Sequence, residues 1–239
     1  MPHKLYLIPN FISENNDPRL IAPYIAETIK DVRLFFVEEE PAAQRFLKKI
    51  NPQLKDFNGY QFFVLNEHTL LKEAKIFFEK NLDKNMGLIS ESGMPCVADP
   101  GAEVVLWAHH HNIEVVPLIG PSSIFLALSA SGLNGQNFAF AGYLPKEKEQ
   151  RTKKIKELEK RSAAEKQTQI FMETPYRNES VFKELLEACH PDTLLCIAVD
   201  LTGQDQHIKT LPVSAWRKAN FAWKKKPALF LLWKGSLKK

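Results

Sequence analysis

Short apolar runs alternate with amphipathic stretches along the first half of the chain. The apolar runs predict strands at residues 4–8, 33–37, 60–65, 86–89 and 113–118. Apolar positions at helical spacing predict helices at residues 18–30, 42–50, 70–82 and 102–111. Strands that alternate with helices in this way form a mostly parallel sheet with helices on both faces.

The second half follows a less regular pattern. Strands are predicted at residues 137–141, 169–172, 194–199 and 228–233, helices at 122–131 and 180–189, and a hairpin at 206–216. This mixture is typical of an α/β domain with some antiparallel pairing. We therefore predict an α/β protein of two domains, residues 1–118 with a mostly parallel sheet and residues 119–239 with a mixed sheet.

The loop from Ser90 to Gly101 carries most of the functional signal. It joins the predicted strand at 86–89 to the helix at 102–111, with Asp99 as the expected N-cap and Pro100 in the first turn. In α/β sheets, ligands bind at the carboxyl ends of strands, which is where this loop begins. Its glycines and prolines also fit an ordinary connection, so the composition alone leaves both interpretations open.

Two further turns lie between a strand and a helix. Ser122 and Ser123 present hydroxyls and amides at a helix start, where a carboxylate is favoured, although a plain helix cap needs the same residues. Glu173 begins a Glu-Thr-Pro-Tyr-Arg segment that ends at Arg177. These two charged residues suit either ligand contacts or an ordinary solvated helix start.

Clustered charges and histidines give weaker indications. Glu38, Glu39 and Glu40 close the second strand, where adjacent carboxylates suit acid–base chemistry or a helix start. The three histidines at 109–111 point about 100° apart on a helix and do not converge on one ion. We therefore predict no metal site.

Composition narrows the class of protein. The chain has 239 residues, 44% hydrophobic and 25% charged, with a formal net charge of +4 and three cysteines without a close pair. No apolar run approaches the ~20 residues of a membrane span, and the cysteine usage is typical of a reducing cytoplasm. The basic runs at 146–161 and 224–226 suit RNA phosphates or an exposed amphipathic helix. The common nucleotide-binding, hydrolase and zinc-protease signatures are absent from the sequence.

Five ordered segments together resemble the tetrapyrrole methylase superfamily, and within it the ribosomal RNA small subunit methyltransferase I group. These are Ser-Glu-Ser-Gly-Met-Pro through Asp-Pro-Gly at 90–101, Val-Val-Pro-Leu-Ile-Gly-Pro-Ser at 115–122, Ala-Ser-Gly-Leu at 130–133, Phe-Ala-Gly-Tyr-Leu-Pro at 140–145 and Glu-Thr-Pro-Tyr-Arg at 173–177. The similarity extends from Leu5 to about Leu232. Each motif is weak alone, but their order makes the set specific.

The resemblance implies a homodimeric enzyme with S-adenosylmethionine in a cleft between two α/β domains. The group transfers methyl to a ribose 2′-hydroxyl of ribosomal RNA in the small subunit, leaving S-adenosylhomocysteine. By position, the residues expected around the cofactor are Glu91, Ser92, Gly93, Met94, Ser122, Ser123, Met172, Ala198 and Pro227. For the proton acceptor we rank Glu39 first, followed by Glu38 and Asp99.

The departures from the group lie on the substrate side. Its Thr-Pro-Ile-Gly-Asn turn becomes Ile-Pro-Asn-Phe-Ile at 8–12, which loses the glycine and places bulk where a substrate backbone would approach. The arginine of its Glu-Asp-Thr-Arg segment is replaced by Pro41, and the lysine of its Glu-Leu-Thr-Lys segment by Gly203. Two alternatives therefore stay open, a methyltransferase acting on a tetrapyrrole or other small molecule, and a cofactor-binding protein that has lost catalysis.

Overall fold

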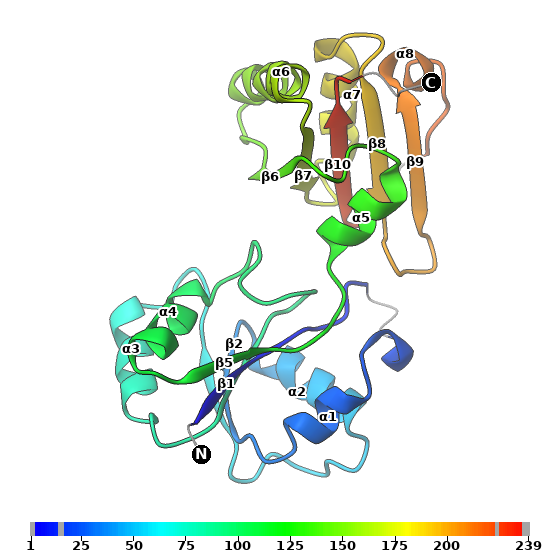
Figure 1. Cartoon of the computed structure of the whole chain (residues 1–239). Helices are drawn as coiled ribbons and strands as arrows, with labels where there is room; N and C mark the ends of the chain where they lie inside the picture. The colour runs from blue at the N-terminus through cyan, green and yellow to red at the C-terminus, as the bar shows by residue number, and fades with distance from the viewer. Residues whose placement is uncertain (1–2, 14–16, 223–224, 236–239) are drawn as a thin grey trace. The chain divides into compact units, whose positions relative to one another are not determined.

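The computed structural model of the chain describes residues 3–13, 17–222 and 225–235. The chain divides into two compact units, with the division between Ser122 and Ser123, four residues beyond the predicted boundary. Each unit has its own five-stranded sheet (Figure 1). No helix in the described residues is both long and apolar enough to cross a membrane.

The first unit is built on a fully parallel sheet, as predicted. Its strands are β1 (Lys4–Ile8), β2 (Leu34–Val37), β3 (Gln61–Val64), β4 (Met86–Ile89) and β5 (Glu114–Pro117), in the order β3-β2-β4-β1-β5. All neighbouring strands pair in parallel. The buried β2 and β4 are apolar throughout because both faces of a parallel sheet are covered.

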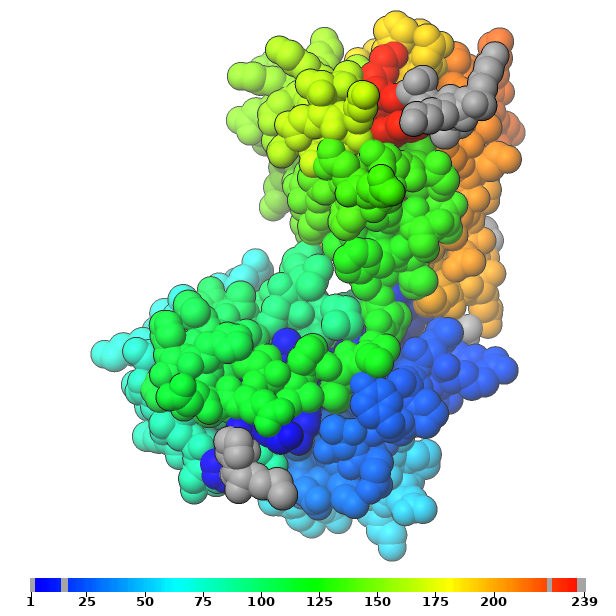
Figure 2. All heavy atoms as spheres, in the orientation of Figure 1, coloured from blue at the N-terminus to red at the C-terminus, as the bar shows by residue number. Residues whose placement is uncertain are grey.

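Helices cover both faces of this sheet. The helices α1 (Tyr24–Thr28) and α2 (Glu40–Ile50) pack in one core with Phe35, while α3 (Leu71–Glu79) and α4 (Ala102–His110) pack in the other with Phe36. Successive side chains on a strand point to opposite faces, so Phe35 and Phe36 divide between the two cores. The residues of α4 (green) lie at the surface of this unit in Figure 2.

Two helix starts differ from the prediction. The helix expected at 18–30 is a 3-10 turn (Pro18–Leu20) followed by the short α1, because Pro23 disfavours helical backbone at the preceding Ala22. The N-cap of α4 is Gly101 rather than Asp99. Its φ of 124° is a conformation that only glycine adopts readily, so the chain enters α4 from a turn that Asp99 does not cap.

The second unit has a mixed sheet, also as predicted. Its strands are β6 (Phe138–Tyr143), β7 (Thr168–Glu173), β8 (Leu194–Val199), β9 (His207–Pro212) and β10 (Ala228–Trp233), in the order β6-β7-β10-β8-β9. Only β6 and β7 pair in parallel. The hairpin expected within 206–216 is wrong, since β9 pairs with β8 and the chain then enters α8 (Val213–Trp216).

The two faces of the second sheet carry different helices. The helices α6 (Lys148–Glu165), α7 (Asn178–Ala188) and α8 share a core with Phe171 and Phe230. On the other side, α5 (Ser123–Ser131) packs against β9 and β10. In Figure 2, α6 (yellow-green) lies at the surface of this unit, so the basic run predicted at 146–161 falls largely on an exposed helix.

Candidate functional site

In the first unit, the loop after β4 is fixed to the loop after β1. Asn10 and Gly93 form an isolated antiparallel bridge in which the Asn10 amide donates to the Gly93 carbonyl (2.9 Å) and the Gly93 amide donates to the Asn10 carbonyl (3.2 Å). The Asn10 side chain also donates to the Ser90 carbonyl (2.9 Å). Gly93 has a φ of 70°, which suits glycine. These bonds hold the predicted cofactor loop in one conformation.

This loop lies at a topological switch point of the sheet. The neighbouring strands β2 and β4 lead to α2 and α4, which cover opposite faces. Connections that leave to opposite faces open a crevice at the carboxyl ends of the two strands, the usual ligand position in such sheets. The predicted residues Glu38, Glu39 and 91–94 all lie at these ends.

Three carboxyl groups lie near one another at these strand ends. The Glu91 amide donates to Glu38 Oε1 (3.2 Å), which ties the ends of β4 and β2 together. Burial, together with the negative charges of Glu38 and Glu91, raises the pKa of Asp99 to about 7, although a hydrogen bond with Ser90 lowers it. Burial likewise raises the pKa of Glu38, although the hydrogen bond from Glu91 lowers it. We call Glu38, Glu91 and Asp99 the acidic cluster.

A carboxyl with a pKa near 7 suits proton transfer at neutral pH. Asp99, which was ranked third from the sequence, is the member of the acidic cluster with a pKa in this range. Glu39, the first sequence candidate, is exposed at the N-cap of α2 and makes no side-chain capping bond. Cys96 lies in the same loop, and burial together with Asp99 and Glu103 raises the pKa of its thiol to about 11, so it is neutral at pH 7.

The substituted turn after β1 does not leave a bulky side chain in the crevice. Phe11 is only 5% exposed and packs edge-on against Phe46 of α2, with ring centroids 5.8 Å apart. Its side chain has become part of the core. The steric obstacle anticipated from the lost glycine is therefore absent at Phe11.

In the second unit, two predicted cofactor residues share a row of the sheet. Met172 on β7 pairs with Leu229 on β10, which pairs with Ala198 on β8. In-register neighbours point to the same face. Thr210 pairs with Cys196 and donates to the Ser131 carbonyl at the end of α5, so this row faces the side that α5 covers.

The remaining predicted residues lie at or beside the first residues of α5 and β10. Ser123 is the first residue of α5 and Ser122 the last residue of the first unit. Pro227 is exposed just before β10, and its carbonyl accepts the Asp200 amide (3.0 Å). The structure thus gathers Glu91 to Met94 in one unit and Met172 with Ala198 in the other.

The segment 173–177 is occupied by internal contacts. Arg177 lies 3.0 Å from Glu173 and donates to the carbonyls of Leu144 and Pro145. Burial raises the pKa of Glu173, while the Arg177 charge lowers it. These contacts favour a structural role for both side chains, and α7 begins directly after Arg177.

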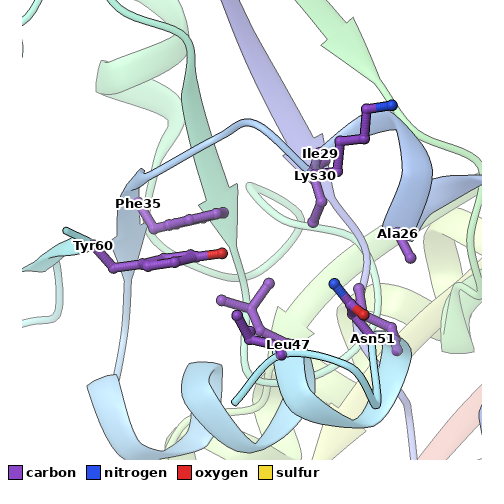
Figure 3. A pocket seen from close by; sticks show the side chains of 9 residues that line it. Ala26, Ile29, Lys30, Phe35, Leu47, Asn51 and Tyr60 are labelled. Carbon is purple, nitrogen blue, oxygen red and sulfur yellow. The ribbon is translucent and has the colours of Figure 1, made fainter. Parts of the chain in front are cut away.

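Neither a metal cluster nor the cavity in Figure 3 offers an alternative ligand site in the described residues. Within the described residues, no group of three His, Cys, Asp or Glu side chains is placed to hold a metal ion. The cavity in Figure 3 lies between α1 and α2 against the stacked rings of Phe35 and Tyr60. Its volume of about 20 Å³ holds little more than one water, far below the size of a cofactor.

Each unit by itself holds groups that suit one part of S-adenosylmethionine. The loop at 91–94 offers a hydroxyl at Ser92 and a backbone at Gly93 without a Cβ, and the row of Met172, Leu229 and Ala198 is apolar and uncharged. Mostly apolar walls with a few polar groups are typical of nucleoside sites. The sequence alone did not predict that Asn10 pairs with Gly93 or that Leu229 lies between Met172 and Ala198, because both contacts follow from strand order rather than from local pattern.

Comparisons with known proteins agree with this fold. The family model for tetrapyrrole (corrin/porphyrin) methylases matches residues 16–215. The ribosomal RNA small subunit methyltransferase I of Vibrio cholerae is 29% identical over 88% of this chain and 69% of its own length. The enzyme of the same name from Escherichia coli O157:H7 is also 29% identical, over 90% and 72%.

A solved structure shows the same fold. Uroporphyrin-III-C-methyltransferase from Thermus thermophilus superposes with a TM-score of 0.55 over 96% of this chain and 94% of its own, at 16% identity. The family match covers most of the chain, and the resemblance drawn from the five motifs is confirmed. The chain belongs to the tetrapyrrole (corrin/porphyrin) methylase family and is an S-adenosylmethionine-dependent methyltransferase.

Proposed function

We propose that this protein methylates a ribose 2′-hydroxyl of small-subunit ribosomal RNA. The observation that carries the proposal is the acidic cluster at the switch point, where Asp99 has a pKa of about 7. A hydroxyl nucleophile needs a proton acceptor of this kind. Two relatives named as ribosomal RNA methyltransferases and the basic net charge of the chain support RNA as the substrate.

The bound cofactor supplies an electrophilic methyl group on a sulfonium. Glu91, Ser92, Gly93, Met94, Ser122, Ser123, Met172, Ala198 and Pro227 are the residues that we propose hold it. Asp99 would accept the proton of the ribose hydroxyl as its oxygen takes the methyl group, which would leave S-adenosylhomocysteine. Burial and the charges of Glu38 and Glu91 keep the pKa of Asp99 near neutrality, and Glu39 is the alternative acceptor.

Holding the reacting groups in line supplies much of the rate. Effects of this kind reach ~7–11 kcal/mol in ideal cases. The bridge between Asn10 and Gly93 and the bond from Glu91 to Glu38 fix the loop after β4, so the chain spends little entropy on ordering it when ligands bind. These contacts are the positioning elements of the proposed mechanism.

The exposed α6 is a proposed secondary RNA contact. The run 146–161 holds eight basic and four acidic residues, and Lys154 and Arg161 are already paired with Glu157 and Glu165. In the tract 224–226, Lys224 lies outside the described residues.

The family resemblance also supports a homodimer, which light scattering of the purified protein measures directly.

A methyl-transfer assay with two candidate acceptors and a control without acceptor tests the proposal. Purified protein and labelled S-adenosylmethionine are incubated with small ribosomal subunits that lack the modification, with uroporphyrinogen, and with neither. We expect label in the ribosomal RNA alone. Label in the tetrapyrrole would replace the RNA assignment, and cofactor binding by calorimetry without any transfer would identify an inactive binder.

A further inference from the structure

A hollow of about 450 Å³ lies in the first unit beside the acidic cluster. Its walls come from the loop after β1, the exposed side of α2 and the start of the loop after β4. The residues that matter here are Asn10, Phe11, Arg45, Phe46, Lys49 and Glu91. We call this the α2 hollow. Its volume falls in the range of roughly 300–1,000 Å³ that is typical of ligand sites.

Two cations face the α2 hollow. Arg45 and Lys49 lie one turn apart on α2, so their side chains project from the same side of the helix. Both side chains are exposed, and neither forms an ion pair with a described residue. Lys49 Nζ lies 5.7 Å from the centre of the Phe11 ring. The charge of Lys49 helps to lower the pKa of Asp17, but both cations stay exposed and can meet an anion.

The wall between these cations and the loop after β1 is rigid. Phe11 and Phe46 are buried and pack edge-to-face. The Asn10 side chain is occupied on both sides, donating to the Ser90 carbonyl and accepting the Phe11 amide (2.7 Å). A preformed wall lowers the entropy cost of binding, which distinguishes this hollow from a set of loose surface lysines.

Glu91 connects the α2 hollow to the acidic cluster. It lines the hollow, and its charge also contributes to the raised pKa of Asp99. A carboxylate on the rim opposes an anion, but two cations against one acid leave the lining net positive. A ligand that carries both an anion and a hydroxyl can therefore place the anion near α2 and the hydroxyl near Asp99.

RNA has this combination at every nucleotide, since each ribose hydroxyl neighbours a phosphodiester. We propose that the α2 hollow binds a backbone phosphate of the substrate RNA through Arg45 and Lys49, next to the ribose that is methylated. This inference rests on the proposed function and adds a phosphate subsite to it. Arginine suits the role because its planar fork matches phosphate oxygens, and lysine adds a point charge.

The test compares Arg45→Ala/Lys49→Ala with wild type and with Lys48→Ala. Lys48 is a matched control, because it lies on the same helix and its ammonium rests over the Phe57 ring, 5.4 Å away, outside the hollow. Affinity for unmodified small ribosomal subunits is measured across a series of salt concentrations. Affinity for S-adenosylmethionine is measured by calorimetry, and circular dichroism checks the fold of each variant.

We expect the double variant to bind the subunits roughly tenfold more weakly, as loss of a charge-assisted contact implies. Its log–log salt slope should fall by about 0.7 for one lost single-strand phosphate contact. Cofactor affinity should stay that of wild type, and Arg45→Lys should restore part of the RNA affinity. Lys48→Ala should match wild type in all of these measurements.

The alternatives give separate outcomes. If the double variant binds the subunits with the affinity and salt slope of Lys48→Ala, the phosphate subsite is wrong and the proposed function stands. If the double variant instead loses cofactor affinity, the hollow serves the cofactor and the subsite is also wrong. If wild type neither binds nor methylates the subunits, the proposed function fails and the subsite fails with it.

Discussion

Asp99 is the residue on which the proposed chemistry depends. Its pKa is about 7, against an ordinary value of 3.8, because burial and the charges of Glu38 and Glu91 disfavour the carboxylate. If Asp99 accepts the proton, the methyl-transfer rate should rise with pH and level off above about 7. Asp99→Asn should lower the rate by about 10²–10⁴, the usual contribution of a general base, whereas the exposed Asp83→Asn should not.

A neighbouring substitution distinguishes this explanation from a general loss of structure. Glu38→Gln removes a negative charge near Asp99, so the midpoint of the rate profile should move to lower pH while the plateau is retained. A rate that does not change with pH between 5 and 9, measured with saturating cofactor, would exclude Asp99 as the acceptor.

The same shift predicts how stability changes with pH. The pKa of Asp99 is raised by folding, so its contribution to stability is fully present below about 3.8 and is lost as the pH rises through about 7. Asp99→Asn should therefore gain stability relative to wild type as the pH rises across that window. Urea unfolding at several pH values measures the difference, and an equal difference at pH 4 and pH 8 would contradict it.

At the scale of single elements, the loop after β4 can be tested through Gly93. Gly93→Ala should cost about 1–2 kcal/mol of stability because its φ of 70° is left-handed, and it should also weaken cofactor binding. Gly59→Ala is the matched control, since its φ is 79° and a Cβ there meets nothing within 4 Å. Equal cofactor affinity in the two variants would show that this loop does not bind the cofactor.

In the second unit, α6 and α7 are joined by a buried ion pair. Arg151 donates to both carboxylate oxygens of Glu184 (2.8 and 2.5 Å), and both side chains are 8% exposed. Glu184→Ala leaves a buried guanidinium without its partner and should cost about 3–5 kcal/mol. Glu179→Ala, on the same helix but in an exposed pair with Lys183, should cost less than about 1 kcal/mol. Denaturant unfolding compares the two variants. Equal losses of stability would contradict the larger contribution expected of the buried ion pair.

The elements themselves were largely predictable, because local periodicity determines them. Strands β4, β8 and β10 begin and end where the apolar runs do. The partner of β9 was not predictable, because strand pairing depends on residues far apart in the chain. The contact between Glu38 and Glu91 likewise requires β2 to neighbour β4, an order that no local pattern gives.

At the scale of the whole molecule, the family and the chemistry of the cofactor are established, and the acceptor is the open question. The chain carries a net charge of +4 and a pI of about 8.8, which suit an anionic substrate without specifying one. The ribose assignment depends on the acidic cluster, and the RNA assignment on the relatives and the α2 hollow.

The most direct test is the position of the transferred methyl group. Small ribosomal subunits are labelled with tritiated S-adenosylmethionine, and their RNA is hydrolysed with alkali. A 2′-O-methyl group removes the hydroxyl that cleaves the neighbouring phosphodiester, so the account predicts label in alkali-resistant dinucleotides. Label recovered in mononucleotides would place the methyl on a base and contradict the account.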